Sequence, residues 1–97
     1  MITEVTKLLG IQYPVIQGGM AWVARARLAA AVSNAGGLGI LSGVTDRPEE
    51  LRMEIRRTRS MTDRPFGVNL MLQSPVASHA ARIVAEEGVP VITTGAG

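Results

Sequence analysis

The sequence predicts an α/β fold in which short buried strands alternate with amphipathic helices. Four short apolar runs, rich in β-branched and large aliphatic residues, do not alternate cleanly with polar residues, which is typical of strands buried on both faces. Helical patterns lie between these runs, and the spacing between runs is close to one βα unit. We therefore expect parallel strands, with right-handed crossovers that place every helix on one side of the sheet. The expected strands cover residues 13–17, 38–41, 66–72 and 89–93.

Three helices are expected over about residues 25–34, 48–59 and 75–87. Glycines follow the first and the third of them, at Gly36 and Gly88, and glycine commonly ends a helix. Asp46 with Glu49 three positions later resembles a capping box at the start of the second helix. Ser74 is the expected N-cap of the third. The apolar residues expected to face the sheet are Leu28, Val32 and Ala35 in the first helix, Leu51 and Ile55 in the second, and Val76, Ala80, Ile83 and Val84 in the third.

Length and composition limit the architecture and the class of protein. The 97 residues, with a net charge of +2 and no cysteine, form one small domain at most and exclude a disulfide scaffold or a thiolate metal site. Neither a signal peptide nor a stretch of about 20 apolar residues is present, so we expect a cytoplasmic protein that does not enter the membrane. The cluster of basic residues between Arg47 and Arg64 also contains acidic residues, so we interpret it as a solvated helix face rather than a nucleic-acid site.

Two architectures fit this order of elements: an open doubly wound sheet and a (β/α)8 barrel. A complete barrel needs about 250 residues, whereas this chain provides three βα units and a fourth strand. If the fold is a barrel, the chain is expected to be too short to form all of it.

The segments that follow the strands are the expected place for chemistry, because ligands of α/β folds bind at the carboxyl ends of strands. These segments are residues 17–21, 42–43 and 93–97, and the third strand contains Asn69 within an otherwise apolar run. Glycine lets a flat ligand approach the backbone, and the carboxamide of Asn69 offers both a donor and an acceptor. Each residue also has a structural interpretation: a turn glycine, a core methionine at Met20, or an amide that bonds a neighbouring strand. The recurrence at all four strand ends favours a ligand site.

Other motifs do not support an alternative site. The glycines of residues 37–39 precede a strand instead of following one, which is the wrong context for a dinucleotide fingerprint. His79 is the only histidine and lies within the third expected helix, so we interpret it as a surface residue. A single histidine and scattered carboxylates do not make a metal site.

Four blocks of the sequence resemble, in order, the FMN-dependent enoyl-acyl-carrier-protein reductases of the FabK type and their relatives, the nitronate monooxygenases, formerly called 2-nitropropane dioxygenases. The blocks are YPVIQGGMAWVA at residues 13–24, LAAAVSNAGGLG at 28–39, FGVNLMLQSP at 66–75 and VITTGAG at 91–97. The resemblance covers nearly the whole chain. It implies that residues 1–97 are the N-terminal portion, about three βα units plus a fourth strand, of a single TIM (β/α)8 barrel domain that binds FMN.

The resemblance also implies which residues contact the cofactor. Gly19, Met20 and Ala21 match the segment that lines the flavin ring, Asn69 matches an amide that hydrogen-bonds it, and Thr94 with Gly95 match the adjacent strand end. No catalytic residue is expected within the chain, because the family's catalytic histidine and its phosphate-binding glycine loops belong to strands beyond Gly97.

Three functions follow as hypotheses. In the reductases, NAD(P)H reduces the flavin, which passes hydride to the enoyl thioester of an acyl carrier protein in fatty acid biosynthesis. Residues 22–24 and 71–75 favour this branch. In the monooxygenases, the flavin oxidises a nitronate with oxygen. The third hypothesis is a non-catalytic module that completes its sheet by self-association, so homo-oligomers remain open; nucleic acid is not an expected partner.

Overall fold

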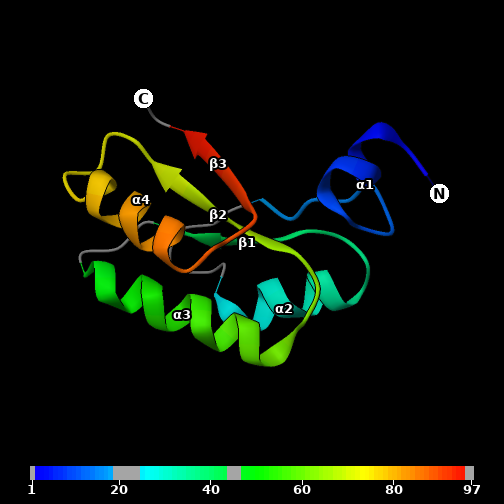
Figure 1. Ribbon diagram of the computed structural model, residues 1–97, viewed down its shortest axis with the longest axis horizontal. Coiled ribbons are helices and arrows are strands. Elements are labelled where there is room, and N and C mark those ends of the chain that lie inside the picture. Colours follow the sequence, from blue (N-terminus) through cyan, green and yellow to red (C-terminus); the bar gives the residue numbers. More distant parts are fainter. Residues whose placement is uncertain (1, 19–24, 44–46, 96–97) are drawn as a thin grey trace.

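The computed structural model describes residues 2–18, 25–43 and 47–95, which form a parallel sheet covered on one face by helices (Figure 1). The sheet contains β1 (Gly39–Ser42), β2 (Phe66–Met71) and β3 (Val91–Gly95) in the order β1-β2-β3, and both pairs of neighbours are parallel. The helices α2 (Ala26–Asn34), α3 (Pro48–Met61) and α4 (Ala77–Glu86) alternate with the strands. The predicted βα alternation and the parallel strands are confirmed, and α2, α3 and α4 lie in one layer as expected.

The main core lies between the sheet and the helices. Phe66, Val68 and Leu70 of β2 are buried there against Ile55 of α3 and Ile83 of α4. Because side chains alternate along a strand, Gly67, Asn69 and Met71 face the opposite side of the sheet. The two faces of β2 are therefore distinct: one packs against the helices, and the other carries the only amide of the strand.

A smaller core lies on the opposite side of the sheet. Its buried members are Ile11, Leu38 and Ile40, and Leu9 and Val91 pack against them. Leu9 ends α1 (Glu4–Leu9), a helix that the sequence analysis did not anticipate and that lies apart from the other helices in Figure 1. A capping box with threonine at both positions, Thr3 and Thr6, stabilises its start. The six-residue helix is too short to show a periodic apolar pattern, and its cap lacks the Glu or Gln that usually marks a capping box.

The predicted first strand over residues 13–17 is wrong in extent. The segment forms one parallel bridge, Ile16 to Leu38, next to β1. Backbone hydrogen bonds of 2.8 Å from Leu38 N to Val15 O and of 3.0 Å from Gln17 N to Leu38 O hold it there. The ladder stops because Pro14 has no N–H and because the side chain of Gln17, instead of the next peptide group, pairs with Ile40.

The predicted helices are confirmed, but two details are wrong. The buried face of α2 is formed by its small residues, Ala26, Ala29, Ala30 and Ser33, whereas Leu28 and Val32 are half-buried and Ala35 is exposed. The reason is that β1 approaches α2 closely at Gly39.

The N-caps of α3 and α4 are Arg47 and Val76, and neither makes a side-chain capping bond; Asp46 lies outside the described residues. Ser74 instead accepts a hydrogen bond from Val76 N within the preceding turn.

The other expected packing residues agree with the structure. Leu51 and Ile55 are buried in α3, and Ala80, Ile83 and Val84 are buried in α4, while Val76 is half-buried. Gly36 and Gly88 both adopt positive φ just after α2 and α4. Within the described ranges, no helix combines the length and apolar character needed to cross a bilayer.

Candidate functional site

The carboxyl ends of the three strands bring one uncharged polar side chain from each to the same edge of the sheet. Ser42 of β1 pairs in register with Asn69 of β2, which pairs in register with Thr93 of β3. Residues in register share a face, and for Asn69 this is the face opposite the helices. We call Ser42, Asn69 and Thr93 the polar row.

One side-chain hydrogen bond lies within the polar row. The hydroxyl of Thr93 donates to Oδ1 of Asn69 over 2.8 Å. Asn69 is half-buried, and Thr93 is exposed. Within the described part of the chain, no group accepts a hydrogen bond from Nδ2 of Asn69. The amide therefore has its oxygen engaged and two N–H donors available to a ligand.

The backbone around Asn69 is closely packed on both sides. Gly43 N donates to Asn69 O over 2.7 Å, and a Cβ on Gly43 would lie 2.5 Å from that same oxygen. On the other side, Leu72 N donates to Gly95 O over 2.9 Å. Only glycine at position 43 allows the backbone to lie so close to β2. These contacts fix the end of β2, and with it the position of the Asn69 side chain.

Gln17 ends the first segment beside β1. Its side-chain Oε1 accepts from Ile40 N over 3.0 Å, and its Nε2 donates to Ile40 O over 2.9 Å. The carboxamide thus replaces a backbone peptide group in the ladder, and the main chain leaves the sheet at Gly18. A Cβ on Gly18 would meet no heavy atom within 4 Å. The backbone is open to an approaching ligand at this point.

The structure brings together some of the residues predicted for the site. Asn69 lies at the predicted edge, and Gly95 pairs with Met71 there, with nothing within 4 Å of the position of a Cβ. Thr94 lies at the same end of the sheet but pairs with Leu70, so its side chain is on the helix-facing side, away from Asn69. The remaining predicted residues, Gly19, Met20 and Ala21, lie outside the described residues.

Sequence reasoning did not select Thr93 as a site residue. The two adjacent threonines are chemically identical, and which of them shares a face with Asn69 depends on the register between β2 and β3. The sequence carries no signal for that register. His79 is exposed in α4, as predicted.

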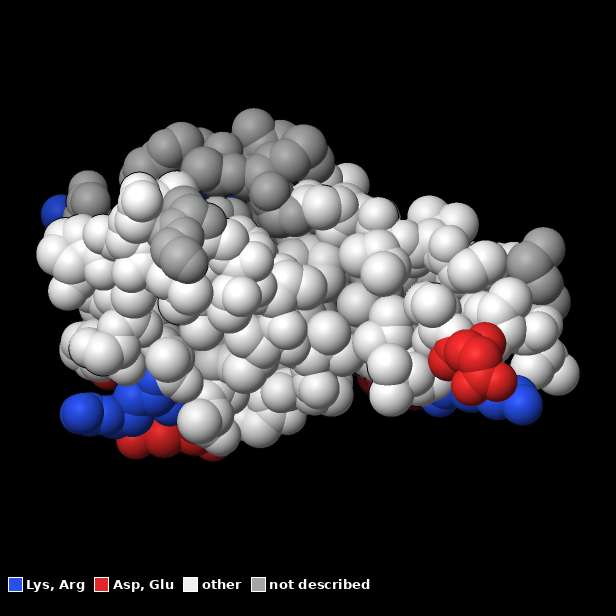
Figure 2. All heavy atoms as spheres, turned by 90° about the horizontal axis from the view of Figure 1, so that it is seen from above, with Lys and Arg blue, Asp and Glu red and all other residues white. Residues whose placement is uncertain are grey.

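No ionisable side chain lies at this edge among residues 42–43, 69–74 and 93–95. Figure 2 shows the side of the molecule opposite α2 and α3, where acidic and basic side chains lie only at the margins of the described surface. Nor does any group of three or more His, Asp or Glu side chains among the described residues have an arrangement that could hold a metal ion. The described residues of this edge can bind and orient a neutral polar ring, and none of them carries an ionisable group.

A cluster of ion pairs lies away from this edge of the sheet, between α3 and α4. The side chain of Glu87 is only 8% exposed and forms ion pairs with Arg52 at 2.8 Å, Arg56 at 3.1 Å and Arg59 at 3.4 Å. Hydrogen bonds from Arg56 and then Arg52 lower the pKa of Glu87 to about 2. The hydrogen bonds that Arg52 donates to Glu86, Glu49 and Glu87 raise its own pKa. These arginines are engaged in holding two helices together.

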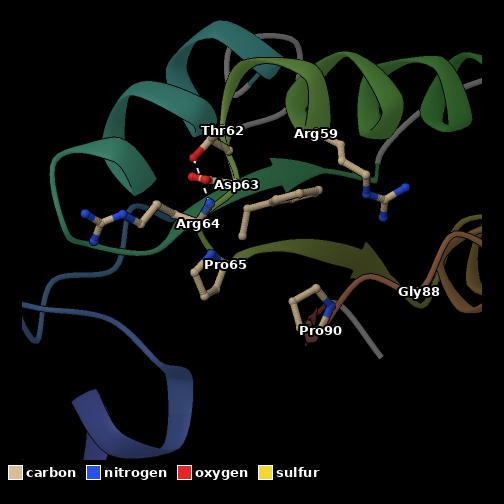
Figure 3. Close-up of a pocket in the computed structure, with 8 residues that line it drawn as sticks. Arg59, Thr62, Asp63, Arg64, Pro65, Gly88 and Pro90 are labelled. Carbon is tan, nitrogen blue, oxygen red and sulfur yellow. Dashed lines mark hydrogen bonds between the residues drawn. The ribbon is translucent and has the colours of Figure 1, made fainter.

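A pocket of about 280 Å³ lies at the opposite end of the sheet from the polar row (Figure 3). It is near the amino ends of β2 and β3, where Phe66 begins one strand and Pro90 precedes the other. Ligands of parallel α/β sheets bind at the other end, so this pocket is not the candidate site. Its lining residues are Arg59, Thr62, Asp63, Arg64, Pro65, Phe66, Gly88 and Pro90.

Comparison with known proteins gives matches over most or all of the chain. The family model described as nitronate monooxygenase matches residues 3–95. Among solved structures, FabK from Thermotoga maritima superposes with a TM-score of 0.97 and 50% identity, covering 100% of this chain and 31% of that one. This likeness shows the fold class, the N-terminal βα units of a (β/α)8 barrel.

Two curated relatives have a similar degree of identity. A nitronate monooxygenase from Pseudomonas aeruginosa is 48% identical over 84% of this chain and 23% of its own length. A (3aS,4S,5R,7aS)-5-hydroxy-7a-methyl-1-oxo-octahydro-1H-indene-4-carboxyl-CoA dehydrogenase from Mycobacterium tuberculosis is 46% identical over 92% of this chain and 25% of its own. The chain thus spans about a quarter of the length of the curated relatives it matches.

Proposed function

Because the chain belongs to the nitronate monooxygenase family, whose model matches residues 3–95, we propose that it forms one side of the FMN site of an NAD(P)H-dependent oxidoreductase that reduces the enoyl thioester of an acyl carrier protein. The family is one of flavin-dependent oxidoreductases, and FabK from Thermotoga maritima is 50% identical to the chain. In this proposal, residues 1–97 are the N-terminal portion of a single barrel domain. A gene that continues for roughly 150 or more further codons would support that assignment, since a barrel needs about 250 residues.

The observation that carries the proposal is the polar row. An isoalloxazine ring is flat and has carbonyl oxygens and ring nitrogens along one edge, so it requires open backbone on its faces and hydrogen-bond donors at its rim. The free N–H donors of Asn69 fit the rim, and the open positions at Gly18 and Gly95 fit a flat ring. When bound, FMN supplies the hydride chemistry, and this chain's residues bind and orient the ring. We propose cofactor contacts for Gly19, Met20, Ala21, Asn69, Thr94 and Gly95; for Thr94, the contact must come from its backbone.

The substrate class rests on two similarities. FabK is 50% identical to the chain, and a second relative is, by its name, a dehydrogenase of a carboxyl-CoA compound, hence of a thioester. The second candidate function is nitronate oxidation, favoured by the 48% identity to a nitronate monooxygenase. The levels of identity are too close to separate the two candidates.

The experiment compares both reactions on the purified full-length enzyme. We expect NAD(P)H oxidation that depends on crotonyl thioester, with little oxygen uptake on addition of an alkyl nitronate. Oxygen uptake with the nitronate and no turnover of the thioester would instead establish the monooxygenase. A colourless protein that is inactive in both assays and self-associates would support a non-catalytic module.

A further inference from the structure

We propose that Thr93 is a positioning residue, which holds the carboxamide of Asn69 so that its N–H donors point toward the flavin. The inference rests on the proposed function, because it assigns a ligand to those donors. The inference also goes beyond the proposed function, because it gives a role in flavin binding to a residue of β3 that itself needs no contact with the cofactor.

The first argument is register. Thr93 lies directly opposite Asn69 in the parallel pair of β2 and β3, and its hydroxyl donates to Oδ1 over 2.8 Å. Thr94 shares the side-chain chemistry of Thr93 but lies one position further, on the other face. Only Thr93 can therefore bond the Asn69 side chain from β3.

The second argument is rotational freedom. A carboxamide can rotate by 180° and exchange its oxygen and nitrogen with little change in shape. An oxygen engaged by Thr93 leaves both N–H donors of Asn69 without a partner among the described residues. Threonine is β-branched and stiff at χ1, so its hydroxyl stays in place. The pair thereby presents donors to the acceptor atoms of an oxidised flavin ring.

The third argument is the rigidity of the frame behind the pair. Asn69 O accepts from Gly43 N at 2.7 Å on one side, and Gly95 O accepts from Leu72 N at 2.9 Å on the other. The backbone of both strands is therefore fixed where the pair lies. The carboxamide rotation of Asn69 is the freedom that remains, and the Thr93 hydroxyl restricts it.

The experiment measures the Kd for FMN on apo-enzyme reconstituted from the full-length protein, together with the midpoint potential of the bound flavin. Thr93→Val keeps the shape of the side chain but removes the hydroxyl, and we expect it to raise the Kd about two- to tenfold, as for the loss of one hydrogen bond. The potential should also shift, because the orientation of the donor at the ring changes. Thr93→Ser retains the hydroxyl and should restore both values.

A double mutant separates positioning from packing. If Thr93 acts through the amide, Thr93→Val should have no further effect on Kd or potential in an Asn69→Ala background. Asn69→Asp tests the direction of the bond, since a carboxylate can accept from Thr93 but donates nothing; we expect weaker FMN binding. The matched control is Thr62→Val, because Thr62 also donates to an asparagine oxygen, Oδ1 of Asn34, at 2.6 Å, but precedes the amino end of β2.

The outcomes distinguish the two proposals. If Asn69→Ala weakens FMN binding but Thr93→Val leaves both Kd and potential unchanged, the positioning role is overturned and the proposed function stands. Equal effects of Thr93→Val in both backgrounds also overturn it, because Thr93 then acts through strand packing. If Asn69→Ala itself has no effect, the flavin site proposed for this edge fails, and the inference fails with it. Should Thr93→Val not fold, Thr93→Ala provides the same comparison.

Discussion

At the scale of single residues, closely packed glycines and one amide explain both the fold and the site. Gly39 has the closest approach among the described glycines: a Cβ there would lie 2.0 Å from the carbonyl oxygen of Ala29. The small face of α2 and this glycine allow helix and strand to pack almost backbone to backbone. At the other end of the sheet, a Cβ on Gly43 would lie 2.5 Å from the carbonyl oxygen of Asn69, so glycine permits the close approach that fixes Asn69.

Gly39→Ala should therefore destabilise the protein. The added methyl group meets backbone rather than a flexible side chain, so α2 or β1 must shift, at a cost of about 1–3 kcal/mol. Urea unfolding of the full-length enzyme measures the change. Gly18→Ala is the control, because no heavy atom lies within 4 Å of a Cβ there; equal stability of the two variants would contradict the close packing.

Asn69→Ala tests the site at the same scale. If Asn69 donates to the flavin as proposed, removing the amide would leave an acceptor of the ring without a donor, and we expect a loss on the order of 1–3 kcal/mol in FMN binding. Flavin occupancy after dialysis and the Kd for FMN provide the measurement. Asn34→Ala is the matched control, since Asn34 also bonds a threonine but at the other end of the molecule. Occupancy that survives dialysis unchanged would remove Asn69 from the site.

At the scale of elements, the ion pairs between α3 and α4 hold the helical layer together. Arg52, Arg56 and Arg59 all lie on the side of α3 that meets Glu87, the C-cap of α4. Cations near a helix C-terminus also interact favourably with its dipole. The basic residues that the sequence analysis interpreted as a solvated helix face are thus partly used in an interhelical contact, which depends on how α3 and α4 pack together.

The Glu87 cluster predicts a pH dependence of stability. The folded-state pKa of Glu87 is lowered from 4.5 to about 2, so its contribution is fully present above pH 4.5 and is lost as the pH falls toward 2. Glu87→Gln should therefore destabilise the protein at pH 7, and the difference from the wild type should shrink between pH 4.5 and pH 2. Urea unfolding across this range measures it.

Glu50→Gln is the control on the same helix. Glu50 pairs with Arg47 at 3.5 Å, and both side chains are largely exposed, at 52% and 80%, so the change should have little effect at any pH. A Glu87→Gln effect that stayed constant from pH 7 to pH 2 would show that the carboxylate's charge is not what stabilises the pair of helices.

At the scale of the whole molecule, one side of the sheet is covered and the other is only partly so. Val68 and Ile40 are buried, at 0% and 1% exposure, because the helices and the small core cover them. Val15 and Ile92 are 57% and 48% exposed. The described sheet ends at β3, an edge strand whose backbone groups can pair with another strand.

We predict that residues 1–97 expressed alone have no reductase activity and do not hold FMN as a stable monomer. The exposed apolar side chains and the edge of β3 favour association, and in the proposed site the described edge would contact only one side of a flavin. Gel filtration with flavin absorbance, followed by an NAD(P)H oxidation assay with an enoyl thioester, provides the test. A monomeric yellow protein that turns over would show that further strands are dispensable.

The sequence by itself determined the alternation of helices and parallel strands, the helix ends at Gly36 and Gly88, and the place of Asn69 at the carboxyl edge, because apolar periodicity and glycine conformations are local properties. Only the tertiary structure decided how the segments meet. The register of β2 and β3 made Thr93, and not Thr94, the partner of Asn69. The close approach of β1 at Gly39 requires the alanine face of α2 to be the buried one. The Gln17 side chain occupies a position in the hydrogen-bond ladder that a strand over residues 13–17 would have filled. Each depends on residues distant in the sequence, whose relative placement is fixed by packing.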